Sequence, residues 1–181
     1  MDIAIIDSDL LNIKRMSYPN LALMKISAYH KQSNDNVRLI LNYSEFESLF
    51  CPKYDKIYIS KIFSWTKVPE WLLHQKNVVY NGTGFYYDKA KFLPKKIEMI
   101  CPDYDLYSEY IELKGKTKRN RYYHDANLGF TTRGCFRKCS FCINKRFSKA
   151  FIHSDPFDFV KKLHCPVPLG RVLFVLVQGH G

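Results

Sequence analysis

The sequence predicts an α/β fold in which a mostly parallel sheet is covered by helices on both faces. Short apolar runs alternate with helical patterns over roughly the first 110 residues, as in chains built from βα units. Of the 181 residues, 46% are hydrophobic and 15% are aromatic, which excludes a disordered, collagen-like or coiled-coil chain. This length suffices for one ordinary domain or two small ones.

The elements of the first half follow from their patterns. Ile3–Ile6 is a continuous, mostly β-branched run that predicts a buried strand. A helix is predicted after Asn20, the candidate N-cap, because Leu21, Met24 and Ala28 recur on one helical face. Further strands are predicted at residues 37–41, 57–60 and 78–80.

The second half is less regular. A strand is predicted at residues 128–132, a helix at 155–163 and another strand at 172–177. Residues 114–126 are polar and basic, which is typical of a linker. We therefore expect one unit at residues 1–113, a basic linker at 114–126 and a second unit at 127–181.

Neither a membrane span nor a signal peptide is predicted. No apolar run approaches the roughly 18 to 20 residues that a span needs. Asp2 stands where a signal peptide would be basic, and no cleavage site follows. We expect a cytoplasmic chain with no membrane partner. Structural disulfides are rare in that compartment, so the six cysteines need another role.

Positive charge is concentrated between residues 114 and 149. The formal net charge of the chain is +11, and this stretch holds eleven Lys or Arg against the single acid Asp125. Such a stretch favours an anionic partner, such as nucleic acid, phosphate or a polyanionic cluster. A solvated loop on a basic protein explains the same charge equally well.

Three of the cysteines, Cys135, Cys139 and Cys142, fall within eight residues. Their Cys-x3-Cys-x2-Cys spacing lets one loop surround a single metal centre, and soft thiolate ligands suit an iron–sulfur cluster. Three ligands would leave one iron of a [4Fe–4S] cluster open to a substrate or cofactor, by the logic of an open catalytic zinc site. The basic neighbours that would favour thiolate over thiol are Arg133, Arg137 and Lys138.

Residues 129–142, Gly-Phe-Thr-Thr-Arg-Gly-Cys-Phe-Arg-Lys-Cys-Ser-Phe-Cys, resemble the cysteine loop of the radical S-adenosylmethionine enzymes. In that family the loop follows the first strand of a (β/α) barrel, usually with an aromatic residue before the last cysteine, here Phe141. The resemblance implies that Cys135, Cys139 and Cys142 ligate a [4Fe–4S] cluster whose fourth iron chelates S-adenosylmethionine. Phe141 would lie beside the adenine and contact it largely through its backbone.

The same resemblance implies a reaction. One electron, from a donor such as flavodoxin or ferredoxin, would cleave S-adenosylmethionine to methionine and a 5′-deoxyadenosyl radical, which abstracts hydrogen from a substrate. The substrate itself has no signature in the sequence.

The N-terminal half is similar to the Rossmann-like, cobalamin-binding-type domain that precedes the barrel in many members of this family. Residues 19–30 and the segment Cys101-Pro102-Asp103-Tyr104 carry this resemblance. The cobalamin motif Asp-x-His-x-x-Gly is missing after the first predicted strand, so we expect the domain shape without the vitamin.

The resemblance covers only the start of a barrel. The 54 residues from Leu128 to Gly181 have room for two strands and one helix, whereas a family barrel needs about six βα units. A Gly-Gly-Glu-type segment for the cofactor's amino group is not recognisable. The expected architecture is therefore a Rossmann-like parallel sheet followed by a truncated radical S-adenosylmethionine barrel, and whether the chain is itself an enzyme stays open.

A second interpretation is a non-catalytic zinc-binding module whose basic stretch binds nucleic acid. Cys165 or His153 would then supply the fourth zinc ligand. A second Cys-x2-Cys knuckle is absent from the sequence, which counts against this interpretation. Cys51 and Cys101 each precede a proline and are expected to be small buried hydrophobic residues.

Overall fold

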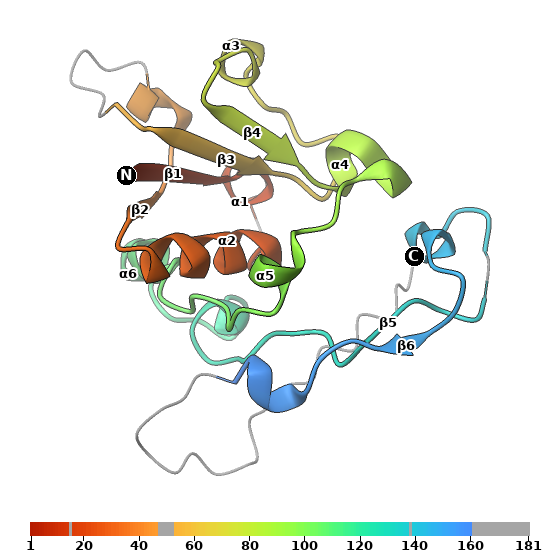
Figure 1. Cartoon of the computed structure of the whole chain (residues 1–181). Coiled ribbons are helices and arrows are strands. Elements are labelled where there is room, and N and C mark those ends of the chain that lie inside the picture. Colours follow the sequence, from red (N-terminus) through yellow and green to blue (C-terminus); the bar gives the residue numbers. More distant parts are fainter. Residues whose placement is uncertain (15, 47–52, 138, 161–181) are drawn as a thin grey trace.

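A four-stranded parallel sheet forms the centre of the protein in a computed structural model (Figure 1). The structure describes residues 1–14, 16–46, 53–137 and 139–160. The strand order is β2-β1-β3-β4, and all three pairings are parallel. The strands are β1 (Asp2–Asp7), β2 (Asn36–Leu39), β3 (Lys56–Ser60) and β4 (Val78–Asn81). The predicted α/β class and the four strands of the first half are confirmed.

The longest helix, α2, spans Leu21–Gln32 and begins where the sequence predicts. The side-chain oxygen of Asn20 accepts a hydrogen bond from the Leu23 N–H at 3.3 Å, which confirms Asn20 as the N-cap. The other α-helices are α1 (Ser8–Asn12), α3 (Glu70–Leu73), α4 (Thr83–Tyr86), α5 (Lys95–Glu98) and α6 (Ser108–Lys114). The 3-10 helices are η1 (Tyr43–Phe46), η2 (Tyr87–Lys89), η3 (Arg121–Tyr123), η4 (Ile143–Arg146) and η5 (Pro156–Asp158).

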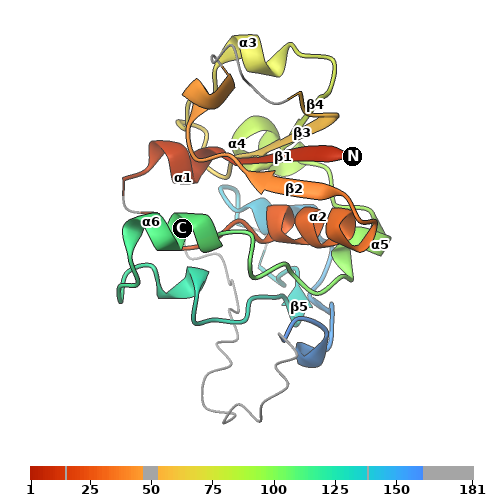
Figure 2. The same cartoon turned by 90° about the vertical axis from the view of Figure 1, so that its left-hand side faces the viewer.

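Alternating side chains of β1 build a hydrophobic core on each face of the sheet. Ile3 and Ile5 pack with residues of α2 and α6, whereas Ala4 and Ile6 pack with Leu72 of α3. Figure 2 shows α2 and α6 on one side of the sheet and α3 on the other. Covering both faces explains why the strands are continuously apolar.

Two buried carboxylates, Asp7 at the end of β1 and Asp9 in α1, lie at the carboxyl end of β1. Asp7 accepts hydrogen bonds from the Tyr107 hydroxyl at 2.7 Å and from the Leu10 N–H at 3.2 Å. Asp9 accepts the Ile62 N–H at 2.6 Å, which fixes the loop after β3. Burial raises the pKa of Asp7 to about 6, although its hydrogen bonds favour the ionised form.

Part of the predicted linker packs against the N-terminal unit. Tyr123 of η3 is buried, its ring meets that of Tyr107, and its hydroxyl donates to the Tyr18 carbonyl at 3.0 Å. Asn120 is buried as well. Within residues 114–126, η3 therefore belongs to the fold rather than to a free connection.

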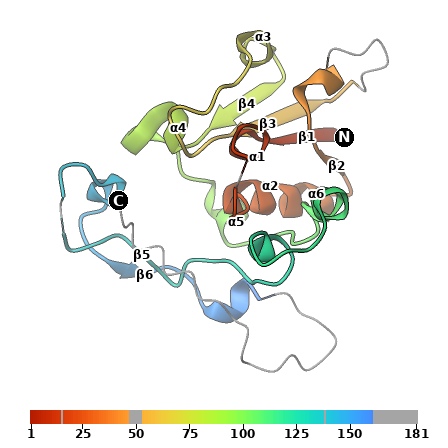
Figure 3. The same cartoon turned by 180° about the vertical axis from the view of Figure 1, so that it is seen from behind.

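The chain beyond residue 127 contains a short antiparallel ribbon, β5 (Thr132–Arg133) with β6 (Phe151–Ile152), which lies apart from the main sheet (Figure 3). The predicted strand at 128–132 is wrong except at its last residue. The Tyr104 hydroxyl binds both the N–H and the carbonyl of Leu128, so those groups pair with a side chain instead of a neighbouring strand.

The remaining predictions for this part fall partly beyond the described residues. The predicted helix at 155–163 forms only the turn η5 in its described part, and residues 161–163 and the predicted strand at 172–177 lie outside the described residues. The described part of 127–181 contains no parallel βα unit, so the barrel stays a prediction. Across the described ranges, no helix has the length and apolar character to cross a membrane.

Candidate functional site

The cysteine loop begins at Gly134, where the backbone conformation and a close neighbour leave no room for a side chain. β5 and β6 pair at Thr132↔Ile152 and Arg133↔Phe151, and the chain leaves β5 at Gly134 with a φ of 81°. A Cβ atom at Gly134 would lie 2.2 Å from the Lys149 carbonyl oxygen. Both the left-handed backbone and the close approach therefore require glycine directly before Cys135.

The three predicted cysteines lie on this loop, half-buried and not in disulfides. The sulfur of Cys135 accepts the Arg137 N–H and that of Cys142 accepts the Asn144 N–H, both at 3.4 Å. A further hydrogen bond from the Cys142 N–H to the Cys139 carbonyl, at 3.1 Å, tightens the turn between them. Backbone N–H groups that point at sulfur stabilise thiolate, as they do around iron–sulfur clusters.

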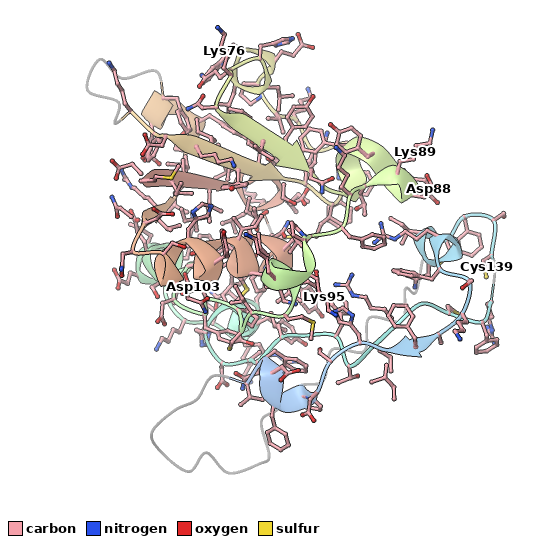
Figure 4. All side chains as sticks on the ribbon, viewed as in Figure 1. Lys76, Asp88, Lys89, Lys95, Asp103 and Cys139 are labelled. Atoms are coloured by element: carbon pink, nitrogen blue, oxygen red, sulfur yellow. The ribbon has the colours of Figure 1, made fainter. Side chains whose placement is uncertain are left out.

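The donor chemistry of the three thiols fits an iron–sulfur cluster. No group of three His, Cys, Asp or Glu side chains gathers as a metal site within the part of the chain that the structure describes. Figure 4 shows Cys139 on the outer side of the loop, on the same side of the molecule as Asp88 and Lys89 of η2.

Phe141 is anchored through its backbone. The residue is 73% exposed, while its carbonyl oxygen accepts a hydrogen bond from the Tyr87 hydroxyl at 2.6 Å. Tyr87 has a φ of 48°, which is unusual for a residue other than glycine. The backbone group expected to meet adenine is thus already bound by a side chain that the sequence did not single out.

A second contact docks the same loop onto the segment after η2. Arg146 donates from Nη1 to the Ala90 carbonyl at 3.3 Å, and its guanidinium lies 4.1 Å from the centre of the Phe92 ring. Phe92 in turn contacts Phe147. The cysteine loop therefore rests on residues 87–92 of the N-terminal unit.

Glu98, at the end of α5, connects the cysteine loop to the sheet domain. Its Oε1 atom accepts hydrogen bonds from Arg133 Nη2 at 2.6 Å, Lys25 Nζ at 3.0 Å and His153 Nε2 at 3.1 Å. Burial alone would raise the pKa of Glu98, but the attraction of Lys25 and Arg133 holds it below its usual value. The sequence did not identify Glu98 as a site residue, because a single carboxylate that follows Lys95 and Lys96 gives no signal for such a role.

Several expectations for the loop's surroundings change in the structure. The Arg133 guanidinium, expected to favour the thiolates, forms an ion pair with Glu98. Burial and the nearby Arg133 lower the pKa of His153, the alternative zinc ligand, and its Nε2 faces Glu98. Cys101 is exposed rather than buried, because it lies outside both hydrophobic cores. Lys138, Cys51 and Cys165 lie outside the described residues.

Fold and site together define an α/β protein that carries a three-cysteine loop on a short ribbon beside its sheet. Comparisons with protein-family models, with curated proteins and with solved structures found no match.

Proposed function

We propose that this chain binds a [4Fe–4S] cluster through Cys135, Cys139 and Cys142 and leaves one iron open to S-adenosylmethionine, as radical S-adenosylmethionine proteins do. The observation that carries the proposal is the loop itself. Three thiols lie within eight residues, and two of their sulfurs already accept backbone N–H hydrogen bonds. Three sulfur ligands suit a cluster with an open corner.

The charges beside the loop support an anionic cluster. Glu98 carries one negative charge, while Lys25 and Arg133 around it carry two positive charges. Arg146 adds a half-buried guanidinium within electrostatic reach of Arg133 and of the Asp88 carboxylate, so these five groups together keep one excess positive charge. This excess of positive charge offsets the charge of a cluster held by three thiolates.

The bound cluster would supply the electron that cleaves the sulfonium of S-adenosylmethionine. For this chain's own residues, the role of Tyr87 follows from its bond to the Phe141 carbonyl. A carbonyl oxygen has two lone pairs, so Phe141 can accept from Tyr87 and from an adenine amino group together. Tyr87 is thus a positioning residue, which fixes the loop backbone where the adenine would lie.

The wider architecture belongs to the same proposal. Residues 1–113 would be a Rossmann-like domain without cobalamin, and residues 127–181 the start of a (β/α) barrel. A cytoplasmic location and a flavodoxin or ferredoxin as electron donor follow from the same assignment.

Anaerobic reconstitution with iron and sulfide tests the proposal. We expect about four irons per chain, and an electron paramagnetic resonance signal after dithionite reduction that changes when S-adenosylmethionine is added. Cys135→Ala, Cys139→Ala and Cys142→Ala should each lose the cluster. Cys101→Ala, a change at an exposed cysteine outside the loop, is the matched control and should keep it.

Two results would contradict the proposal. One equivalent of zinc with no iron, even after reconstitution, would identify the zinc module instead. A cluster whose signal ignores S-adenosylmethionine would indicate that no iron is open. Release of 5′-deoxyadenosine would extend the proposal from binding to turnover.

A further inference from the structure

The basic loop, defined as residues 114–122, is held together by hydrogen bonds of the Asn120 side chain. The Asn120 side chain is buried, and its Oδ1 accepts hydrogen bonds from the N–H of Thr117 at 2.8 Å and from its hydroxyl at 3.0 Å. Its Nδ2 donates to the Gly115 carbonyl at 2.8 Å. These bonds close the loop around Asn120, so the remaining polar side chains point away from the fold.

The outward side chains are almost all cationic. Between residues 114 and 124 there are five Lys or Arg and no acid, and each of the five is exposed. They are Lys114, Lys116, Lys118, Arg119 and Arg121. Figure 2 shows this part of the chain beside α6, on the opposite side of the sheet from α3. A fixed loop with this charge is a surface for polyanions.

An exposed aromatic stack adjoins these cations. The rings of Tyr18 and Tyr122 lie 4.3 Å apart at an angle of 24°, and Tyr18 is 47% exposed. The Arg121 guanidinium lies 4.9 Å from the centre of the Tyr122 ring and donates to its hydroxyl at 2.9 Å. The Tyr18 carbonyl accepts the Tyr123 hydroxyl, so the stack stands on a buried residue.

We propose that the basic loop and Tyr18 form a binding surface for single-stranded nucleic acid. The cations bind phosphates, and the exposed Tyr18 ring stacks on a base. A duplex hides the faces of its bases, and a membrane surface offers no flat rings to stack, so the aromatic pair favours a single strand. This surface uses none of the cysteine-loop residues and goes beyond the cluster-binding function.

The test is fluorescence anisotropy of the full reconstituted chain with labelled oligothymidylate and oligouridylate of about 15 nucleotides. We expect binding that weakens steeply with salt. Lys118→Ala with Arg119→Ala should weaken it roughly tenfold or more and reduce the salt slope by about 1.4. The matched control is Lys76→Ala with Lys89→Ala, two exposed lysines away from α6 (Figure 4), and should bind like the wild type.

Tyr18 separates stacking from charge. Tyr18→Ala should weaken binding roughly tenfold, while Tyr18→Phe keeps the ring and should bind like the wild type. Equal losses in the Lys118/Arg119 and Lys76/Lys89 double variants, or no effect of Tyr18→Ala, would overturn the proposal. Equal affinity for duplex or for phosphatidylserine vesicles would also overturn it. Cys135→Ala should bind the strand normally, so failure of the cluster proposal and failure of this one are distinguishable.

Discussion

Replacing Tyr107 with phenylalanine removes one hydroxyl from the centre of the fold. That hydroxyl donates to Asp7 Oδ2 at 2.7 Å and accepts the Asn20 N–H at 2.9 Å. Asp7 and Asn20 are both buried, at 1% and 5% exposure. The substitution therefore leaves two polar groups without this partner, in a place that water does not reach.

The size of the effect depends on the charge of Asp7. A hydrogen bond to an ionised group contributes about 1.5 to 3 kcal/mol, and a buried donor left unpaired costs about 1 to 3 kcal/mol. At pH 8, where Asp7 is ionised, Tyr107→Phe should lose about 4 kcal/mol of unfolding free energy. At pH 5 the folded protein holds Asp7 mostly protonated, and the loss should fall to about 2 kcal/mol.

The wild-type pH dependence has the corresponding sign. The pKa of Asp7 rises from 3.8 to about 6 on folding, so the folded chain binds this proton more tightly than the unfolded chain. The contribution of Asp7 to stability is therefore largest at low pH and falls by about 3 kcal/mol as pH rises through this window. Tyr107→Phe raises the folded pKa further, so the decline continues above pH 6.

Urea denaturation at pH 5 and pH 8 measures both losses. Comparing variant with wild type at each pH cancels the groups that titrate alike in both. Tyr123→Phe is the control, because its hydroxyl donates to an uncharged carbonyl and its loss should be the same at both pH values. A Tyr107→Phe loss that does not grow between pH 5 and pH 8 would refute the reasoning.

Three further predictions concern the cysteine loop and its support. Glu98→Gln removes the carboxylate that Lys25, Arg133 and His153 share, and should lower the free energy of unfolding, measured with urea, by about 2 to 3 kcal/mol. The control Glu112→Gln changes an exposed residue and should stay within about 0.5 kcal/mol. Equal losses in the two variants would contradict the role of Glu98. Gly134→Ala should lower the iron content after reconstitution, because the added Cβ meets the Lys149 carbonyl. Gly115 has a similar φ but open space around its Cβ position, so Gly115→Ala should keep the iron. Unchanged iron in both variants would contradict the steric argument. Tyr87→Phe should change the free energy of unfolding by no more than about 1 kcal/mol. It should also weaken the change that S-adenosylmethionine causes in the electron paramagnetic resonance signal of the cluster. An unchanged response would show that Tyr87 does not support the site.

The sheet could be predicted because its information is local. Buried parallel strands are continuous apolar runs, and Ile3–Ile6 and residues 57–60 need no distant partner to be recognised. The N-cap at Asn20 is equally local. By contrast, residues 92–110 look irregular, yet they contain α5 and the start of α6, because helices of four and seven residues leave too few turns for a periodic pattern.

The candidate site divides in the same way. Spacing along the chain identified Cys135, Cys139 and Cys142, whereas the positive φ of Gly134 is known only from the structure. Tyr87 lies 54 residues before its partner Phe141, and Glu98 lies 35 residues before its partner Arg133, so only the fold shows that they support the loop. The predicted strand at 128–132 failed for this reason too, since the distant Tyr104 hydroxyl binds the backbone of Leu128.

The most direct test of the central claim is an electron paramagnetic resonance titration of the reduced, reconstituted chain with S-adenosylmethionine. We predict a [4Fe–4S] signal that shifts to a new form as the ligand saturates, and no such signal in Cys142→Ala. A chain that takes up zinc but no iron, or a cluster whose signal stays the same at saturating ligand, would contradict the account.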